Sequence, residues 1–267
     1  MGVAHYENFP VASLLLPLEF RHPVEQIYRF AREADDFADE GTLSNADRLA
    51  LLEDFRGQLR RIERGEPAGN EAFAALAGVI ARYRLPLAAF YDLLSAFSQD
   101  VHKKRYADFA EVMDYCRRSA NPIGRLLLQI FDRATPRNLD HSDSICSALQ
   151  LVNFWQDVTI DYAKDRIYLP QDEMKRCAVT ERHIAGRLCD DAWRALMRFQ
   201  VERAREMLQY GYPLGRALPG RIGLEIRATV HGGLRILEKI ERARYDVFRH
   251  RPVLRWHDWP VILARAL

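Results

Sequence analysis

Apolar residues recur every three or four positions along most of the 267-residue chain, and alternating runs rich in valine, isoleucine and threonine are nearly absent. This periodicity predicts an all-α protein. Proline and asparagine favour helix N-termini, and an Asn-Pro pair inside a periodic run predicts a kink at Asn121-Pro122. We expect helices to begin near Pro23, Asn45, Asn70 and Pro86, and to cover 108–131, 142–163, 190–210 and 224–248.

Two segments lack this periodicity, TPRNLDHS at 135–142 and the stretch 166–180, so both are predicted to be loops. The second is a candidate lid, because it directly follows an aspartate-rich segment. No repeat or low-complexity region divides the chain. With 48% hydrophobic residues it can bury one substantial core, and we expect a single domain over 1–267.

Net charge, cysteine spacing and the length of apolar runs argue against several classes of protein. A net charge of +2 does not favour nucleic-acid binding, and the four cysteines form no C-x-x-C pair, which is typical of reduced thiols in a cytoplasmic protein. No apolar run is long enough to cross a bilayer. The segment WHDWPVILARAL is amphipathic and is a candidate for peripheral contact with the inner membrane face.

The candidate chemistry lies in two aspartate-rich segments, ADDFADE around Asp35 and NFWQDVTIDYAKD around Asp157. Asp35 and Asp39 are four residues apart, as are Asp157, Asp161 and Asp165, so each set lies on one face of a helix. Like charges at this spacing destabilise a helix, which implies a compensating cation. Carboxylate and amide oxygens are ligands that Mg²⁺ prefers, commonly together with substrate phosphates.

A single pair of this kind is more often a solvated acidic helix face. Here both segments lie among apolar residues, in IYRFAREADDFADE and LQLVNFWQDVTID, which predicts that the two faces turn inward toward one cavity. Arg32, Lys164 and Arg166 stand next to the aspartates in the sequence. They form either salt bridges with the aspartates or a cationic clamp on a diphosphate.

Taken together, the motifs resemble the squalene and phytoene synthase family of head-to-head prenyl synthases, from about His5 to Phe248. The matching elements follow the family's order: HYENF, LLP with Arg21, Tyr28, Arg32, Asp35, Asp39, QDVHKKRY with Asp100, Tyr115 in a YC dipeptide, Ala120, Gly124, Gln150, Asn153, Asp157, Asp161 and RIYLP.

The resemblance implies an isoprenoid synthase helical bundle with a central apolar cavity, in which the two aspartate motifs face each other and carry Mg²⁺. The implied metal ligands or their support are Asp35, Asp36, Asp39, Asn153, Asp157 and Asp161, with Arg32 and Tyr28 also in the catalytic set. The implied substrate-binding residues are His5, Asn8, Phe9, Arg21, Asp100, Tyr115, Ala120, Gly124, Gln150, Asn153, Arg166 and Tyr245. The aromatic side chains Phe9, Tyr28, Phe154 and Tyr245 are candidates for cation–π stabilisation of a carbocation, although such stripes are often simple core.

Some residues depart from the family's common pattern, and these departures resemble one branch of the family. The chain has SANPIG at 119–124 where V-A-G is common, and Gln156 where arginine is usual. Together with ENFPVAS, these residues resemble the bacterial hopanoid branch, which implies Mg²⁺-dependent conversion of presqualene diphosphate to hydroxysqualene by ionisation, rearrangement and water capture, a lyase reaction. Two alternatives stay open: a transferase that makes presqualene diphosphate or phytoene, and a non-catalytic helical assembly protein. Neighbouring pathway enzymes are possible partners.

No dinucleotide fingerprint, G-x-S-x-G elbow, H-E-x-x-H pair or P-loop occurs in the sequence. The sequence therefore offers nothing to support a serine hydrolase, a zincin or a P-loop enzyme.

Overall fold

The computed structural model describes residues 16–249 and 251–267. In this part of the chain every regular element is a helix, which confirms the predicted all-α class. The first group of helices is α1 (Leu18–Asp39), α2 (Asn45–Glu63), α3 (Glu71–Tyr83), α4 (Leu87–His102), α5 (Phe109–Ser119), α6 (Asn121–Ile130) and α7 (Pro136–Gln156). The second group is α8 (Val158–Ala163), α9 (Gln171–Arg176), α10 (Glu181–Ala185), α11 (Asp191–Gly211), α12 (Leu214–Ala217), α13 (Gly220–Arg242), the 3₁₀ turn η1 (Trp256–Asp258) and α14 (Trp259–Ala266).

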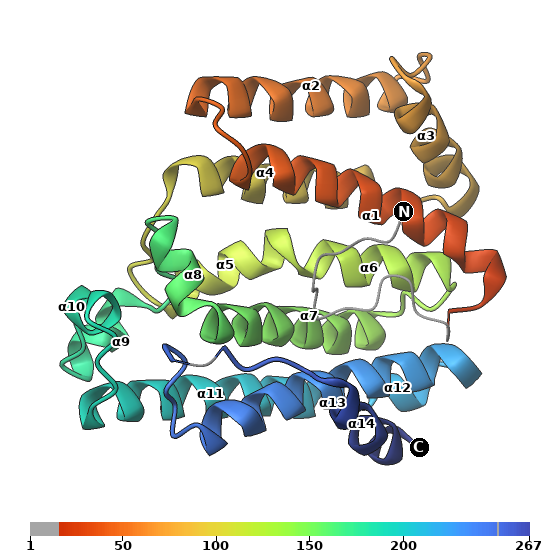
Figure 1. Cartoon of the computed structure of the whole chain (residues 1–267). Coiled ribbons are helices and arrows are strands. Elements are labelled where there is room, and N and C mark those ends of the chain that lie inside the picture. The colour runs from red at the N-terminus through yellow and green to blue at the C-terminus, as the bar shows by residue number, and fades with distance from the viewer. Residues whose placement is uncertain (1–15, 250) are drawn as a thin grey trace.

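The helices form a stack in which α7 is the central element (Figure 1). Helices α1 to α4 lie on one side of it, with α5 and α6 between, and α11 to α14 lie on the other side. Helix α7 packs against both α6 and α11, and buried residues surround its whole circumference, as expected of a helix enclosed by others. The acidic end of α7 is therefore held within the stack.

Two large apolar clusters make up most of the core, and a small third one lies between α13 and α14. One large cluster is built from α1 to α4 and the other mainly from α7, α11 and α13, and Phe20 and Phe131 pack against both. The first cluster contains a group of phenylalanines in edge-to-face contact, in which the Phe30 ring lies 5.2 Å from the Phe90 ring and 6.0 Å from the Phe73 ring. These contacts fix α1, which carries the first aspartate segment.

Several helix ends differ from the sequence predictions. Helix α1 begins at Leu18, five residues before the predicted start, and Pro23 is its sixth residue, where it lacks the N–H that would donate to the Glu19 carbonyl. The helix expected near Asn45 begins at that residue, but Ser44 and not Asn45 is its N-cap, because the Ser44 hydroxyl accepts a hydrogen bond from the N–H of Asp47 at 3.2 Å. Asn70 caps α3 as predicted.

Both segments predicted to be loops contain helix. TPRNLDHS was wrong as a loop because Thr135 caps α7 and Pro136 occupies its first position, so TPRN is a helix start. The stretch 166–180 contains α9. The last long helix, α13, starts at Gly220 and ends at Arg242, earlier at both ends than predicted.

Two of the helices predicted from the sequence, 108–131 and 142–163, are interrupted in the structure. The predicted kink at Asn121-Pro122 is a break at Ala120 between α5 and α6, because Pro122 has no N–H to donate to the preceding turn. The helix predicted over 142–163 is interrupted at Asp157, which separates α7 from α8. Asp165 lies beyond the end of α8 with a positive φ of 57°, so it does not continue the helical face.

Gly124 allows α6 to approach α7 closely. A Cβ atom at this position would lie 2.3 Å from Ser142 Oγ and 2.6 Å from Cys146 Sγ, on short side chains that cannot move aside. We expect Gly124→Ala to destabilise the protein by about 1–3 kcal/mol because the helices must separate. Denaturant unfolding measures this change.

The matched control for this prediction is Gly78→Ala on the exposed side of α3, where nothing lies within 4 Å of the added Cβ. Alanine removes the conformational cost of a helical glycine, so this variant should gain about 0.5–1 kcal/mol. Equal effects at the two positions would contradict the close-approach role of Gly124.

Among the described residues, no helix has both the length and the apolar character that a membrane span requires.

Candidate active site

One face of α1 carries the first set of predicted site residues. Tyr28, Arg32, Asp35 and Asp39 are spaced at intervals of three or four residues and therefore share this face. The Arg32 guanidinium lies 2.6 Å from Asp36 and 3.8 Å from Asp35. Arg32 is thus a salt-bridge partner of the aspartates in this structure.

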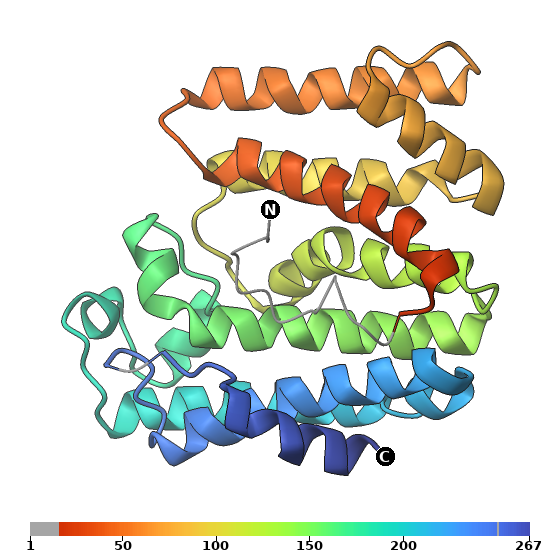
Figure 2. The same cartoon turned by 45° about the vertical axis from the view of Figure 1, so that its right-hand side comes forward.

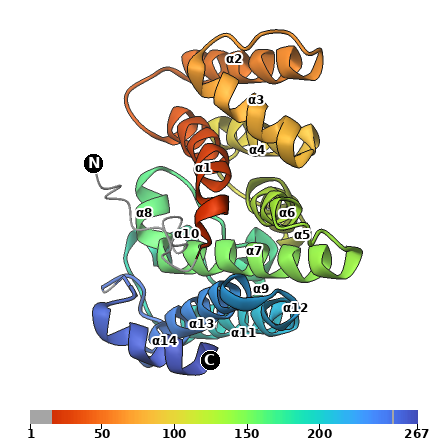
Figure 3. The same ribbon diagram turned by 90° about the vertical axis from the view of Figure 1, so that its right-hand side faces the viewer.

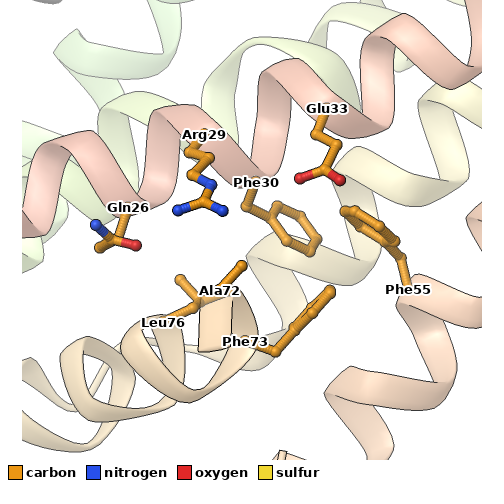
Figure 4. Close-up of a pocket in the computed structure, with 8 residues that line it drawn as sticks. All are labelled: Gln26, Arg29, Phe30, Glu33, Phe55, Ala72, Phe73 and Leu76. Atoms are coloured by element: carbon orange, nitrogen blue, oxygen red, sulfur yellow. The ribbon is translucent and has the colours of Figure 1, made fainter. Parts of the chain in front are cut away.

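A hollow on the opposite face of α1 is unrelated to the aspartates. Gln26, Phe30 and Glu33 line it from α1, together with side chains of α2 and α3, around about 240 Å³ of space that is partly open to solvent (Figure 4). At helical spacing, these positions lie on the side of α1 opposite to Asp35 and Asp39. We therefore assign no role to this hollow in the chemistry of Asp35 and Asp39.

The second set of residues lies at the junction of α7 and α8. Asp157 sits at the interruption itself, where its carboxylate accepts a hydrogen bond from the Asn153 amide at 2.8 Å. The same carboxylate accepts two hydrogen bonds from Arg251, one of them at 3.0 Å. Asp161 lies one turn further on, in α8. The interruption thus turns Asp157 toward a segment 94 residues later in the chain.

Arg166 joins the two aspartate segments. Its buried guanidinium forms a two-pronged ion pair with Asp39 of α1, at 2.6 and 3.1 Å, and donates to the Asp100 carbonyl at 3.2 Å. Lys164 adds a second cation 3.5 Å from Asp39. The predicted meeting of the two segments therefore occurs through the basic residues that follow α8, and Arg166 and Lys164 form salt bridges here.

The backbone supports this bridge. The N–H of Ile167 donates to the Lys104 carbonyl at 2.9 Å, and the N–H of Gln171 donates to the Tyr106 carbonyl at 2.9 Å. The segment after α4 thus runs beside the segment after α8 (Figure 2). This pairing places Asp100, at the end of α4, next to Arg166.

Three carboxyl groups at this meeting point are difficult to ionise. Burial, together with the Asp39 and Asp100 carboxylates, raises the pKa of Asp35 to about 7, although 39% of its side-chain surface stays open. Burial raises the pKa of Asp100 to about 7, and burial with the Asp157 carboxylate raises the pKa of Asp161 to about 8. A carboxyl group that is both surrounded by protein and partly open lines a recess.

Asp39 behaves differently. Burial opposes its ionisation, but the hydrogen bonds and positive charges of Arg166 and Lys164 outweigh burial and lower its pKa. The recess therefore contains two carboxylates paired with arginine, Asp39 and Asp157, beside others that lack sufficient positive charge. Such a recess suits an added cation.

These pKa values predict how stability depends on pH. The pKa values of Asp35, Asp100 and Asp161 rise from 3.8 in the unfolded chain to about 7, 7 and 8, so between these limits the folded protein binds more protons. Stability contributed by the protonated groups is therefore lost as the pH rises through this window. We expect these three groups to lower the Tm of the metal-free protein progressively as the pH rises from about 4 to about 8, and to have no further effect above that.

Thermal unfolding in the presence of a chelator measures this slope, and Asp161→Asn provides the control. The variant removes the group with the highest of the three pKa values, so its Tm should fall less steeply with pH. An unchanged slope in the variant would contradict the pKa assigned to Asp161.

The donor chemistry at this site fits Mg²⁺. Within 16–249 and 251–267, no group of three or more His, Cys, Asp or Glu side chains is close enough to hold a metal alone. Arg166 and Arg251 occupy two of the candidate carboxylates, Asp39 and Asp157. Because Mg²⁺ is usually bound by one or two carboxylates with water and substrate phosphates, the aspartates would hold the ion jointly with a diphosphate.

An aromatic wall adjoins the recess. The rings of Phe154 and Tyr168 are stacked at 3.6 Å, and Tyr115 lies 6.1 Å from Phe154 and 5.7 Å from Tyr168. The Tyr115 hydroxyl donates to the Asp100 carboxylate at 2.7 Å. Phe154, Tyr168, Asp161 and Arg166 also line a hollow of about 190 Å³, partly open to solvent. Charged and aromatic groups therefore meet at one place, whereas the larger central cavity implied by the resemblance stays a prediction.

The remaining predicted residues are distributed more widely. Arg21 is exposed and donates to the Leu16 carbonyl at 3.2 Å. Tyr245 lies beyond α13, where its carbonyl accepts from the Trp193 indole at 3.0 Å and Arg198 lies 5.8 Å from its ring, so none of these contacts joins it to the aspartates. Gln150 lies on α7, one turn before Asn153. Ala120 and Gly124 lie where α5, α6 and α7 meet, and His5, Asn8 and Phe9 lie outside the described residues.

The structure also shows the surroundings of the residues that depart from the family pattern, Gln156 and the segment 119–124. The buried Gln156 amide donates to the Pro252 carbonyl at 2.5 Å, so it holds the C-terminal segment. Asn121 accepts a hydrogen bond from Ser147 at 2.8 Å. The Ser119 hydroxyl is buried and has no hydrogen-bond partner among the described residues.

Sequence reasoning missed two components of the site. Arg251 was not predicted because nothing in RHRPVLR separates it from the neighbouring arginines, and its partner Asp157 is 94 residues away. Tyr168 belongs to the RIYLP match but was not predicted as a site residue, although its position two residues after Arg166 weakly indicated that it lies near the site. Both depend on how distant segments pack.

The helical stack, with two aspartate segments meeting beside an aromatic wall, defines an all-α protein of the isoprenoid synthase fold. The chain belongs to the squalene/phytoene synthase family, whose model matches residues 3–258.

Named relatives carry more than one activity. The hydroxysqualene synthase of Zymomonas mobilis is 41% identical over 178 residues, which are 65% of this chain and 58% of that protein. The 15-cis-phytoene synthase of Synechococcus elongatus is 30% identical over 276 residues, 97% of this chain and 89% of that protein. The chain thus matches well under two thirds of the hydroxysqualene synthase but most of the phytoene synthase.

Solved structures agree on the fold. The squalene synthase HpnC from Alicyclobacillus acidocaldarius superposes with a TM-score of 0.84 at 36% identity, covering 91% of this chain and 90% of that one. A dehydrosqualene synthase in complex with ligand gives a TM-score of 0.85 at 21% identity, covering 94% and 87%, and supports the fold alone.

Proposed function

We propose that this protein converts presqualene diphosphate to hydroxysqualene in a Mg²⁺-dependent reaction. The observation that carries the proposal is the joining of Asp39 to Arg166, which brings both aspartate segments to one recess beside aromatic rings. The hydroxysqualene synthase relatives, at 41% and 33% identity, support the choice of product.

The chemistry follows from these groups. The C–O bond to the diphosphate breaks and the leaving group takes the electron pair; rearrangement moves the positive charge, and water adds its oxygen to the cation and loses one proton. Mg²⁺, when bound, would stabilise the charge that develops on the leaving diphosphate. Asp35, Asp39, Asp157 and Asp161 are the proposed ligands or their support, with Asn153 beside them.

The protein's own side chains supply the remaining functions. Arg166, Arg32 and Arg251 already lie against the aspartates, so they are positioned to exchange carboxylate for diphosphate oxygens, to which a guanidinium donates equally well. Phe154 and Tyr168 line the hollow beside the aspartates, where ring surface that their mutual stacking leaves uncovered would offer negative electrostatic potential to a carbocation. Ser119 is the better candidate for holding the attacking water, because its hydroxyl has no partner whereas Asn121 is occupied by Ser147.

A transferase is the second candidate, favoured by the phytoene synthase relatives that match most of the chain. The deciding experiment incubates the protein and Mg²⁺ separately with presqualene diphosphate, farnesyl diphosphate and geranylgeranyl diphosphate, and identifies products by mass spectrometry. Hydroxysqualene from presqualene diphosphate, carrying ¹⁸O from labelled water, would support the proposal. If product formed from farnesyl or geranylgeranyl diphosphate but none formed from presqualene diphosphate, the protein would be a transferase and the hydroxysqualene assignment would be wrong.

A further inference from the structure

The C-terminal segment presents an apolar stripe to solvent. Trp256 of η1 is 82% exposed, and Trp259 and Leu263 of α14 are each 41% exposed. With Leu267 they follow a spacing of three, four and four residues, so they lie on one side of the helix. Ile262 and Ala266 face α13 instead and are buried against it. Helix α14 lies at the outer edge of the stack (Figure 3).

The charges around this stripe are positive. Residues 249–267 contain four arginines and one aspartate, and because Arg251 pairs with Asp157 and Arg249 with Asp246, Arg255 and Arg265 are the two arginines beside the stripe. The aspartate, Asp258, is fully buried between Arg235 and Lys239, so it contributes no negative charge to the outer surface. Arg255, His257 and Arg265 are exposed beside the stripe, and Glu238 of α13 pairs with Arg265. Arg255 and His257 remain as cationic or titratable groups beside Trp256.

The stripe is presented by a fixed support. Arg235 donates to Asp258 at 2.8 Å, Lys239 donates to both Asp258 and the Val253 carbonyl, and Gln156 donates to the Pro252 carbonyl. These bonds attach the segment to α13 and α7 along its length. The exposed tryptophans therefore cannot turn inward without breaking a buried ion-pair network.

We propose that this face, formed by Trp256, Trp259, Leu263 and the flanking Arg255, docks onto an anionic phospholipid bilayer. Tryptophan concentrates at membrane interfaces because one part of the ring is apolar and the N–H is polar, and neighbouring arginines add attraction to anionic headgroups. A second copy of the chain fits less well, because a symmetric contact would bring two cationic faces together. The proposal is independent of the substrate assigned above.

The test measures co-sedimentation of the full chain with vesicles of phosphatidylcholine, with and without phosphatidylglycerol, together with tryptophan emission. Binding should require phosphatidylglycerol and shift the emission to the blue. The other two tryptophans, Trp155 and Trp193, are fully buried, so the shift reports Trp256 and Trp259. Trp256→Ser with Trp259→Ser should weaken binding about tenfold, and Arg255→Gln roughly fivefold.

The matched control is Leu188→Ser, which removes an equally apolar side chain, 50% exposed, from the loop before α11 and should leave vesicle binding unchanged. Circular dichroism verifies the fold of each variant, and the single Arg255→Gln change keeps the test valid if the double variant does not fold. The proposal is overturned by absence of binding, by equal binding to phosphatidylcholine alone, by undiminished binding of the variants, or by a dimer in solution that the tryptophan substitutions dissociate.

Discussion

The Asp161→Asn substitution is expected to lower turnover of presqualene diphosphate by about 10²–10³-fold while leaving the fold at least as stable as before. Asp161 makes no ion pair within the described residues, and burial and the Asp157 carboxylate raise its pKa to about 8. Asparagine keeps the shape of the side chain and removes the unfavourable charge, so folding loses nothing. A site that needs this charge to hold a cation loses its main function.

Asp165→Asn is the matched control for this prediction. It makes the same chemical change four residues later, at an exposed position beyond the end of α8, and asparagine tolerates the positive φ of 57° there. Steady-state kinetics and thermal unfolding should show near-normal activity for this variant. Full activity of Asp161→Asn would remove Asp161 from the metal site. An unmodified protein that turns over none of the three diphosphates would instead favour the non-catalytic alternative.

The Arg166→Met substitution is expected to destabilise the protein by about 3 kcal/mol or more, because it leaves Asp39 buried with only Lys164 at 3.5 Å for compensation. Turnover should fall as well, since Arg166 is the residue that joins the two aspartate segments. Urea unfolding measures the first effect. Arg166→Lys should recover only part of the stability, because an ammonium group cannot form the two-pronged contact with Asp39.

Arg125→Met provides the comparison for Arg166. Arg125 also forms a two-pronged pair with a carboxylate, Asp143, at 2.5 to 3.2 Å, but its side chain is exposed on the outside of α6. A surface pair of this kind contributes at most about 1 kcal/mol. If the two variants lost equal stability, burial would not be the reason for the importance of Arg166.

The class of fold and the two aspartate segments could be predicted because their signals are local. The repeated three- and four-residue spacing of apolar positions identifies helices without reference to the rest of the chain. Asp35 and Asp39 lie on one helical face, as expected, because they fall within the uninterrupted α1. The helix start at Asn70 was also predicted from adjacent residues, and the helix predicted over 190–210 is α11, Asp191–Gly211.

Features that depend on distant contacts could not be predicted. Asp165 leaves the helical face at a positive φ, where its carbonyl is held by Arg105, and Asp157 interrupts the helix where Arg251 approaches it. The start of α7 was missed because TPRNLDHS lacks apolar periodicity, although Thr135 and Pro136 form a favourable helix N-terminus. For Asp157 and Asp165, the sequence alone does not show which distant arginine will contact the residue, and so it does not show where the helix is interrupted or ends.

The salt bridge between Asp157 and Arg251 also determines when the site can be completed during synthesis of the chain. The two residues are 94 positions apart, which corresponds to about 5 to 19 seconds of synthesis at the usual rate of translation. Helices α1 to α8 can pack in this interval, but Asp157 has no guanidinium until the ribosome has passed residue 251. The nascent chain therefore carries an incomplete recess, and the protein completes its site after most of its core has been made.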